Sequence, residues 1–186
     1  AEITAALVTT DTLVVAATAT VTSSDAMSVA EANAVDAKTS GVITATLDTG
    51  DTASYSTLTG TGNAYTVTVN DANTTAITAT ALSTLGGKTT GTVTVSNAIA
   101  ISGTQSEITA ALVTTDTLVV AGTATATISD AAEVAITATA LSAIGGKTSG
   151  AVTVTNAIAI SGTQAEVTAA LVTTDTLVVA GTATAT

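Results

Sequence analysis

The chain lacks cysteine, histidine, proline, phenylalanine and tryptophan, and its 186 residues include only two tyrosines. Without cysteine there is no disulfide framework, and no thiolate is available as a nucleophile or metal ligand. Without histidine the commonest general base and the commonest zinc ligand are both missing. We therefore predict that the protein is not an enzyme.

Basic residues are also scarce. Three lysines stand against 14 acidic residues, which gives a net charge of −11. Such a chain cannot present the basic surface that nucleic acids require, so nucleic acid is excluded as a partner. The longest apolar runs, such as LVVAA at 13–17, are far shorter than the roughly 20 residues of a membrane span. We expect no membrane-spanning segment.

Small residues are abundant instead, with 47 threonines and 40 alanines. An interior of alanine and valine without phenylalanine or tryptophan is thin for a chain of this length. Thin interiors suit stacked structures, in which each layer buries a little surface against its neighbours. The composition therefore favours a repeat architecture.

Internal repeats are strong. The segment 77–127 returns almost unchanged at 136–186, a shift of 59 residues. The piece EITAALVTTDTLVVA begins at Glu2 and Glu107, and again at Glu166 with one change. We predict that residues 1–186 form a single elongated solenoid of about seven coils. This interpretation makes the chain an excerpt of a longer array or one unit of a head-to-tail assembly.

Within each repeat, strand-like pieces alternate threonine with apolar residues, the pattern of half-buried strands. The predicted inward positions are Val67, Val69, Val93, Val95, Val152 and Val154. An oxygen-bearing residue with glutamate three positions on then predicts the start of a helix. This spacing occurs at Ser28–Glu31, Thr104–Glu107, Asp130–Glu133 and Thr163–Glu166. Gly-Gly at 86–87 and 145–146 predicts that the alanine-rich helices stop there.

Together these patterns predict a parallel β-solenoid, similar to a β-helix, with short helical turns in each coil of 23–33 residues. The alternative is a fully β right-handed β-helix, in which the alanine-rich segments are short strands as well. In both cases successive strands would stack about 4.8 Å apart and pair through their backbones.

The pieces VTVSNA, TQSEITAAL and GGKTTGTVTVS resemble the Ala/Thr/Asp-rich repeats of giant bacterial extracellular proteins, notably cyanobacterial surface adhesins and sheath- or filament-forming proteins. The resemblance implies a secreted structural solenoid at the cell surface or outside the cell, often assisted by calcium. The nonapeptide pattern of calcium-binding repeats, GGxGxDxUx, is absent from this chain.

Acidic and amide residues end several of the strand-like pieces. They are Asp25, Asp71, Asp130, Asn97 and Asn156. A stack of such oxygen ligands suits Ca²⁺, which takes six to eight of them. The alternative is turn chemistry, in which aspartate and asparagine bond to the nearby backbone. No cofactor is expected other than this possible calcium, and Asp11, Asp116 and Asp175 are interpreted as turn residues too.

The three lysines all sit in glycine-containing loops. Lys88 and Lys147 follow Gly-Gly in a sequence similar to the end of a phosphate-binding loop, but the required earlier glycine is replaced by Leu82 and Leu141. We interpret these segments as helix-ending loops with a solvated lysine, and Lys38 occupies the matching place in DAKTSG.

Threonines recur at alternate positions of the strand-like pieces and predict a ladder on one face. Its members are Thr20, Thr22, Thr44, Thr46, Thr66, Thr68, Thr92, Thr94, Thr125, Thr127 and Thr153. Flat threonine ladders are typical of ice-binding surfaces, although exposed strand positions favour threonine in any case.

The sequence therefore predicts an extracellular structural protein, either a self-assembling filament or sheath component or the stalk of a giant surface adhesin. Backbone hydrogen bonds between coils would hold it, and its partners would be copies of itself. The alternative function is a binding module for ice or another surface, using the threonine ladder.

Overall fold

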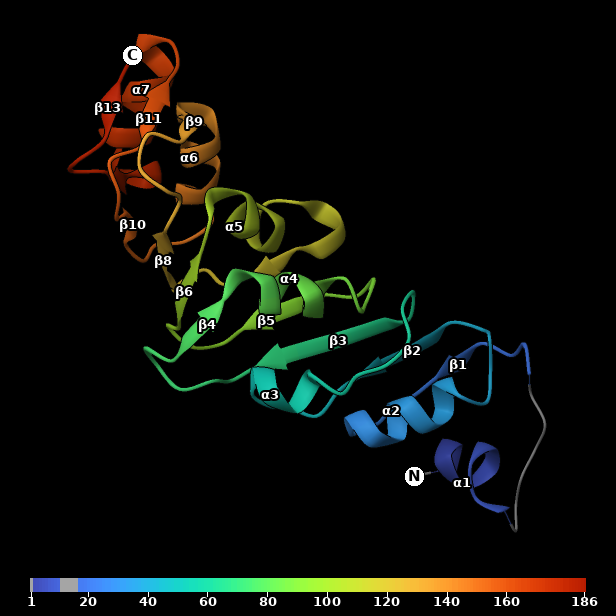
Figure 1. Cartoon of the computed structure of the whole chain (residues 1–186). Helices are drawn as coiled ribbons and strands as arrows, with labels where there is room; N and C mark the ends of the chain where they lie inside the picture. The colour runs from blue at the N-terminus through green and yellow to red at the C-terminus, as the bar shows by residue number, and fades with distance from the viewer. Residues whose placement is uncertain (1, 11–16) are drawn as a thin grey trace.

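The computed structural model describes residues 2–10 and 17–186. This part of the chain is an α/β fold with thirteen strands in three parallel sheets and seven α-helices (Figure 1). The strands are β1 (Val21–Thr22), β2 (Ile43–Thr46), β3 (Ala64–Val69), β4 (Ala76–Thr78), β5 (Val93–Val95), β6 (Ala100–Gly103), β7 (Val119–Val120), β8 (Thr125–Ile128), β9 (Ala135–Thr137), β10 (Val152–Val154), β11 (Ala159–Ser161), β12 (Val178–Val179) and β13 (Thr184–Ala185). The helices are α1 (Glu2–Leu7), α2 (Val29–Asp36), α3 (Thr52–Tyr55), α4 (Ala79–Gly86), α5 (Gln105–Leu112), α6 (Ala138–Gly145) and α7 (Gln164–Leu171). Two 3₁₀ turns, η2 (Thr115–Thr117) and η3 (Thr174–Thr176), follow α5 and α7.

The prediction of a β-solenoid is wrong, and so is the fully β alternative of a β-helix. No sheet in the described part runs the length of the molecule. The first sheet has the order β1-β2-β3-β5-β7, the second β12-β10-β8-β6-β4 and the third β13-β11-β9. The alanine-rich segments are helices of six to eight residues, apart from α3. The interpretation as a β-solenoid filament or fibril is therefore corrected to an α/β fold.

The succession of sheets follows from how the strands are connected. A helix carries the chain back to the sheet it has just left, as α4 does between β4 and β5. A short turn carries the chain forward to the next sheet, as between β8 and β9. The 59-residue repeat from β4 to β8 contains two helices, and three short turns link its strands to one another and to β9. Each repeat therefore advances by one sheet, and no sheet can continue indefinitely.

A left-handed residue marks the turn between β3 and β4 and the equivalent turn between β8 and β9. Thr74 has φ 64° and Glu133 has φ 65°. The N–H of Thr74 donates to the Ala98 carbonyl and that of Glu133 to the Ala157 carbonyl, both at 2.8 Å. The capping box predicted at Asp130–Glu133 is therefore wrong, because Glu133 lies in a turn and its N–H bonds to another layer of the stack. A layer here means one strand step along a sheet, with the turns and helix that belong to it.

The other three capping boxes are confirmed. Ser28, Thr104 and Thr163 are the N-caps of α2, α5 and α7, each with its glutamate bonded back to the cap. Helices α4 and α6 begin without a glutamate, on the hydroxyls of Thr78 and Thr137.

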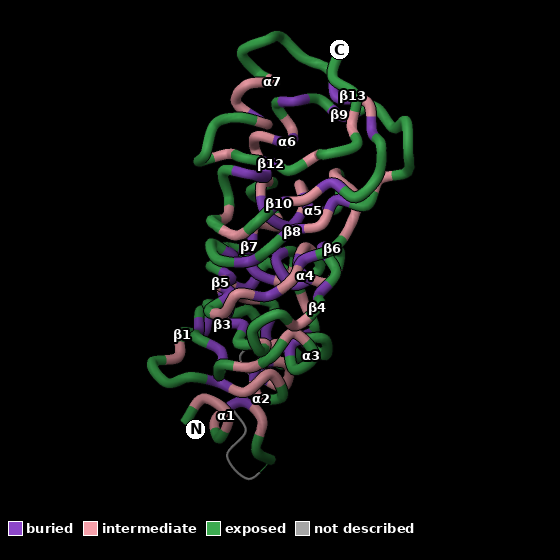
Figure 2. Tube along the Cα trace, turned by 90° about the vertical axis from the view of Figure 1, so that its left-hand side faces the viewer, coloured by how far each residue is buried: buried purple, intermediate pink, exposed green. Residues whose placement is uncertain are grey.

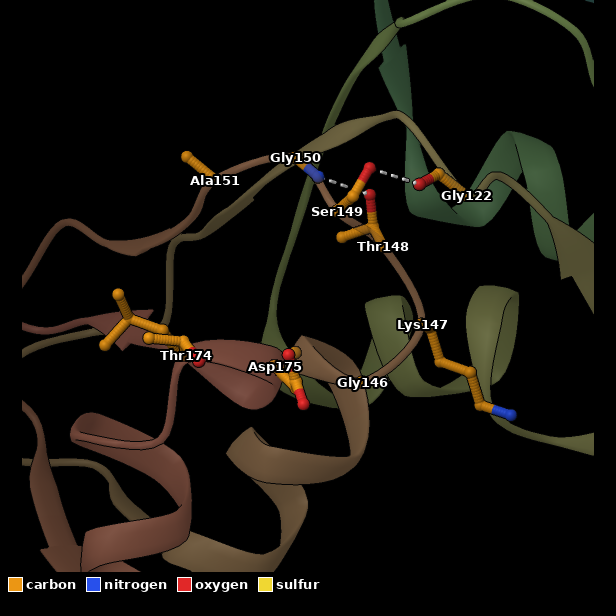
Figure 3. Close-up of a pocket in the computed structure, with 11 residues that line it drawn as sticks. Gly122, Gly146, Lys147, Thr148, Ser149, Gly150, Ala151, Thr174 and Asp175 are labelled. Atoms are coloured by element: carbon orange, nitrogen blue, oxygen red, sulfur yellow. Dashed lines mark hydrogen bonds between the residues drawn. The ribbon is translucent and has the colours of Figure 1, made fainter.

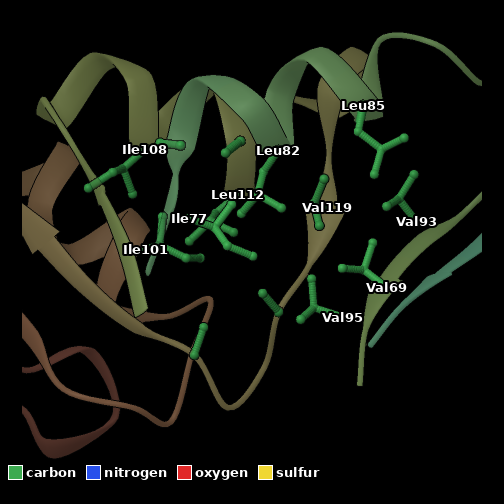
Figure 4. Packing of buried hydrophobic residues seen from close by; sticks show 14 of the residues in the cluster. Val69, Ile77, Leu82, Leu85, Val93, Val95, Ile101, Ile108, Leu112 and Val119 are labelled. Atoms are coloured by element: carbon green, nitrogen blue, oxygen red, sulfur yellow. The ribbon is translucent and has the colours of Figure 1, made fainter. Parts of the chain in front are cut away.

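The core lies between the sheets and the helices, and runs from one end of the molecule to the other (Figure 2). The predicted inward valines are all buried, at 5 % exposure or less. Leu82 and Leu85 of α4 and Leu112 of α5 project toward the strands and meet side chains such as Val93 and Ile101 (Figure 4). Aliphatic residues of moderate size thus fill the space that aromatic residues fill in other domains. No helix in the described ranges is both long and apolar enough to cross a membrane.

The glycines after the helices serve close approach rather than an unusual backbone angle. The residue that caps α4, Gly87, has an ordinary helical φ of −69°. A Cβ on Gly86 would lie 2.2 Å from the Thr117 carbonyl oxygen, and one on Gly150 would lie 2.1 Å from that of Ala124. The helix stop is confirmed. The first glycine of each pair, Gly86 or Gly145, is required because a backbone carbonyl oxygen of another layer would lie 2.2–2.3 Å from its Cβ.

Replacing Gly150 therefore tests the packing between layers. We expect Gly150→Ala to lower the free energy of unfolding by about 3 kcal/mol, because backbone atoms must move apart to admit the methyl group. The matched control is Gly122→Ala, since nothing lies within 4 Å of a Cβ there. Chemical denaturation of both variants measures the effect. Equal stabilities of the two variants would contradict this account of the packing.

The two tyrosines are buried in different ways. The Tyr55 hydroxyl lies 2.7 Å from the Asp48 carbonyl oxygen and 2.8 Å from that of Thr68. The Tyr65 hydroxyl is buried without a hydrogen-bond partner in the described structure. Burial, and to a lesser extent the charge of Asp36, raise the pKa of Tyr65 to about 12. Leaving a buried hydroxyl unpaired costs free energy, whereas a paired one does not.

The two Tyr→Phe variants should consequently change stability in opposite directions. Tyr65→Phe removes an unpaired hydroxyl, and we expect it to raise the free energy of unfolding by about 1 kcal/mol. Tyr55→Phe removes the hydroxyl that bonds to the Asp48 carbonyl, and we expect a loss of about 1–2 kcal/mol. Urea denaturation followed by circular dichroism distinguishes them, and a loss in both variants would overturn this interpretation of Tyr65.

Candidate functional site

The glycine- and lysine-containing loops form the most regular polar feature of the structure. A threonine follows each lysine, and its hydroxyl donates to a backbone carbonyl of the preceding layer. Thr39 bonds to Ala19 at 2.6 Å, Thr89 to Tyr65 at 2.8 Å and Thr148 to Ala124. Each hydroxyl also accepts from the N–H of the glycine two residues later, at 2.9–3.0 Å. We call this arrangement the Thr–Gly clasp.

Most backbone N–H groups of these loops are already bonded within the protein. In the loop after α6 the N–H of Gly146 bonds to Ser142, that of Lys147 to Ile144 and that of Ser149 to Gly122. Phosphate-binding loops instead direct several free N–H groups at the ligand. The geometry thus agrees with the interpretation of Lys88 and Lys147 as residues of helix-ending loops.

Two of these loops each form one wall of an open groove. The first groove has a volume of about 380 Å³ and lies between residues 86–91 and the η2 region. The second has a volume of about 620 Å³ and lies between residues 145–151 and the η3 region (Figure 3). Asp116 belongs to the first groove and Asp175 to the second, and both are exposed. The two grooves occupy the same place in successive 59-residue repeats.

The strand-terminal acidic and amide residues are brought together in pairs. Asn97 donates to the Asp71 carbonyl at 2.8 Å, and Asn156 donates to the Asp130 carbonyl at 2.7 Å. The first pair follows strands of the first sheet and the second pair follows strands of the second sheet, so the five predicted ligands are not one stack. Asp25 follows β1, where its carbonyl accepts from the Ser23 hydroxyl.

Two of these carboxylates bind the start of a helix in a neighbouring layer. Asp71 accepts from the Thr52 N–H at 2.7 Å, and Asp130 accepts from the Gln105 N–H at 2.6 Å. Both donors are the first residues of helices, where backbone N–H groups lack partners within the helix. The sequence did not reveal these contacts, because they join residues 19 and 25 positions apart.

No group of three or more potential metal-ligating side chains occurs within residues 2–10 and 17–186. Asp116 and Asp175, interpreted from the sequence as turn residues, lie in the 3₁₀ turns. Their equivalent, Asp11, lies outside the described residues.

The threonine ladder is divided between sheets. In the first sheet Thr22 pairs with Thr44, Thr46 with Thr66 and Thr68 with Thr94. Thr92 precedes β5, and Thr20 lies outside the strands. Thr125, Thr127 and Thr153 belong to the second sheet, where Thr127 pairs with Thr153. The threonines thus form two shorter surfaces, and ice binding stays a prediction.

Comparison with protein-family models, curated proteins and solved structures finds no match to this chain. Its function is therefore inferred from its own residues.

Several other acids hold helix N-termini. The Glu107 carboxylate accepts from the Thr104 N–H at 2.8 Å and from the Thr80 hydroxyl of α4 at 3.0 Å. The equivalent Glu166 bonds to Thr163 and Thr139. Hydrogen bonds from the cap backbone, followed by those from the threonine hydroxyls, lower the pKa of both glutamates below 4.5. The ionised form is therefore favoured in the folded state.

These bonds make part of the stability depend on pH. Because the folded-state pKa lies below the unfolded value, the stabilisation is complete above about pH 4.5 and disappears as the pH falls through the folded value. We expect the double variant Glu107→Gln/Glu166→Gln to lose less melting temperature than the wild type between pH 7 and pH 3. Glu133→Gln, which changes a glutamate that caps no helix, is the control. Identical pH profiles for wild type and double variant would contradict this role.

Proposed function

We propose that the chain is a non-catalytic structural spacer of an extracellular or cell-surface protein, built by adding α/β repeats. The observation that carries the proposal is the Thr–Gly clasp, which joins each loop to the layer before it. Thr39, Thr89 and Thr148 repeat the same bonds in three places along the chain. A structure built this way grows by adding identical layers, which is what a spacer requires.

The placement of the acidic residues supports the same proposal. Several acidic side chains cap a helix or bond one layer to the next, as those of Asp71, Asp130, Glu107 and Glu166 do. Catalysis by carboxylates needs a pair facing a common substrate position. The grooves of the described structure contain one acid each, Asp36, Asp116 or Asp175, or none.

The extracellular location rests on the resemblance of repeat pieces such as GGKTTGTVTVS to those of bacterial surface proteins. The net charge of −11 keeps neighbouring molecules apart at low ionic strength. The predicted partners, further copies of this chain, stay a prediction that sedimentation at several protein concentrations would test. Calcium likewise stays a prediction, which melting with and without EDTA would test.

The spacer proposal is tested by changing the number of repeats. A chain with residues 77–135 duplicated should gain two layers, since the 59-residue repeat separates β4 from β9, and β10 lies two strand steps from β6 in the second sheet, with β8 between them. At about 4.8 Å per layer the maximum dimension should grow by at least about 10 Å. Small-angle X-ray scattering measures this length. An unchanged length would refute the spacer proposal.

A further inference from the structure

Each of the two equivalent grooves contains a carboxylate, that of Asp116 or Asp175, which makes no polar contact that stabilises the described part of the fold. At the end of α6 and in the loop that follows, Gly145 and Gly150 pack closely against the backbone of other layers, and Thr148 and Gly150 form the clasp. Asp175, on the opposite wall, has no hydrogen bond or ion pair to another described residue. Asp116 occupies the same position in the other groove, again without such a partner. Each groove thus has one wall of clasp residues and one wall with a free carboxylate, and Figure 3 shows the groove of Asp175.

The residues that line the grooves disfavour three classes of ligand: anions, metal ions and apolar molecules. An anionic ligand is disfavoured, because most loop N–H groups are occupied, the carboxylate repels anions and the chain has a net charge of −11. Lys147 extends away from Asp175 (Figure 3). A metal ion is disfavoured, because each groove offers a single carboxylate and Ca²⁺ takes six to eight oxygen ligands. An apolar ligand is disfavoured, because hydroxyls, glycines and a carboxylate make up most of the lining and each groove has a single large apolar side chain, Leu118 or Leu177.

A neutral polyhydroxy ligand fits these walls. A carboxylate has two oxygens and can accept from two neighbouring hydroxyls of one ligand. The hydroxyl of Thr174 beside Asp175, and that of Thr115 beside Asp116, offer both a donor and an acceptor. The opposite wall contains several glycines, which have no side chains, and both grooves are open at the surface.

The repetition of the groove favours a polymer over a small sugar. The two grooves lie two layers apart, about 10 Å along the stack, with a further step from the first sheet to the second. A polymer that enters both grooves gains avidity, which compensates for weak binding at each. We propose that Asp116 and Asp175 are equivalent binding residues for a linear neutral polysaccharide.

Affinity electrophoresis in native gels containing soluble amylose, a linear neutral glucan, tests this proposal. We expect the amylose to retard the wild type, and either Asp116→Ala or Asp175→Ala to weaken the interaction by roughly tenfold or more, because avidity is lost. The double variant should migrate as it does without polysaccharide. Asp25→Ala is the matched control, since it removes the same charge from an exposed residue outside the grooves.

Three results would overturn the proposal. The first is wild-type migration that amylose does not change. The second is undiminished retardation of the double variant, which would place binding elsewhere. The third is retardation that EDTA abolishes, which would make a cation the binding group. Melting temperatures of the variants within about 2 °C of the wild type would exclude unfolding as the cause of a lost interaction. None of these outcomes depends on the spacer proposal, which the length measurement tests separately.

Discussion

The distance between a threonine hydroxyl and the carbonyl of the previous layer controls how this chain stacks. Thr89 can reach the Tyr65 carbonyl only because Gly91 has no side chain, since a Cβ there would lie 2.2 Å from the same oxygen. The loop therefore depends on both residues: the Thr89 hydroxyl makes the bond, and the absence of a side chain at Gly91 allows the two backbones to approach. Parallel strand pairing on either side then follows, because the register of β5 on β3 is set within four residues of the clasp.

This constraint explains a composition that is poor in large residues. Layers held at strand spacing leave a narrow interior, and valine, isoleucine, leucine and alanine fill it. The two tyrosines lie in the part of the chain that departs from the 59-residue repeat. Tyr65 is buried there at the cost of an unpaired hydroxyl, and Tyr55 lies in the shortest helix.

The local structure was predictable from the sequence, whereas the connections between layers were not. Alternation placed Val67 and Val93 in the core, and the spacing of Thr104 and Glu107 located the start of α5. Both depend on residues close together in the chain. The same spacing failed at Glu133, where a bond to the Ala157 carbonyl outweighs the local helix signal. Nothing local distinguishes a link that returns to the previous sheet from one that advances, and this distinction separates the α/β fold from a β-solenoid.

The candidate site follows the same division. Asp71 and Asp130 were recognised as candidates, but their partners are helix N-termini in neighbouring layers, which residue types alone do not specify. Asp116 and Asp175 were interpreted as turn residues, and they do lie in turns. The loops that form the other wall of each groove are distant in the sequence, so no local pattern indicates the groove. Because the clasp uses the threonine hydroxyl and the glycine N–H, and Lys147 extends away from Asp175, the carboxylate is left as the group that determines what the groove can bind. The structural repeat thus places the proposed binding carboxylate twice, at Asp116 and Asp175, and neither residue takes part in the clasp that holds the layers together.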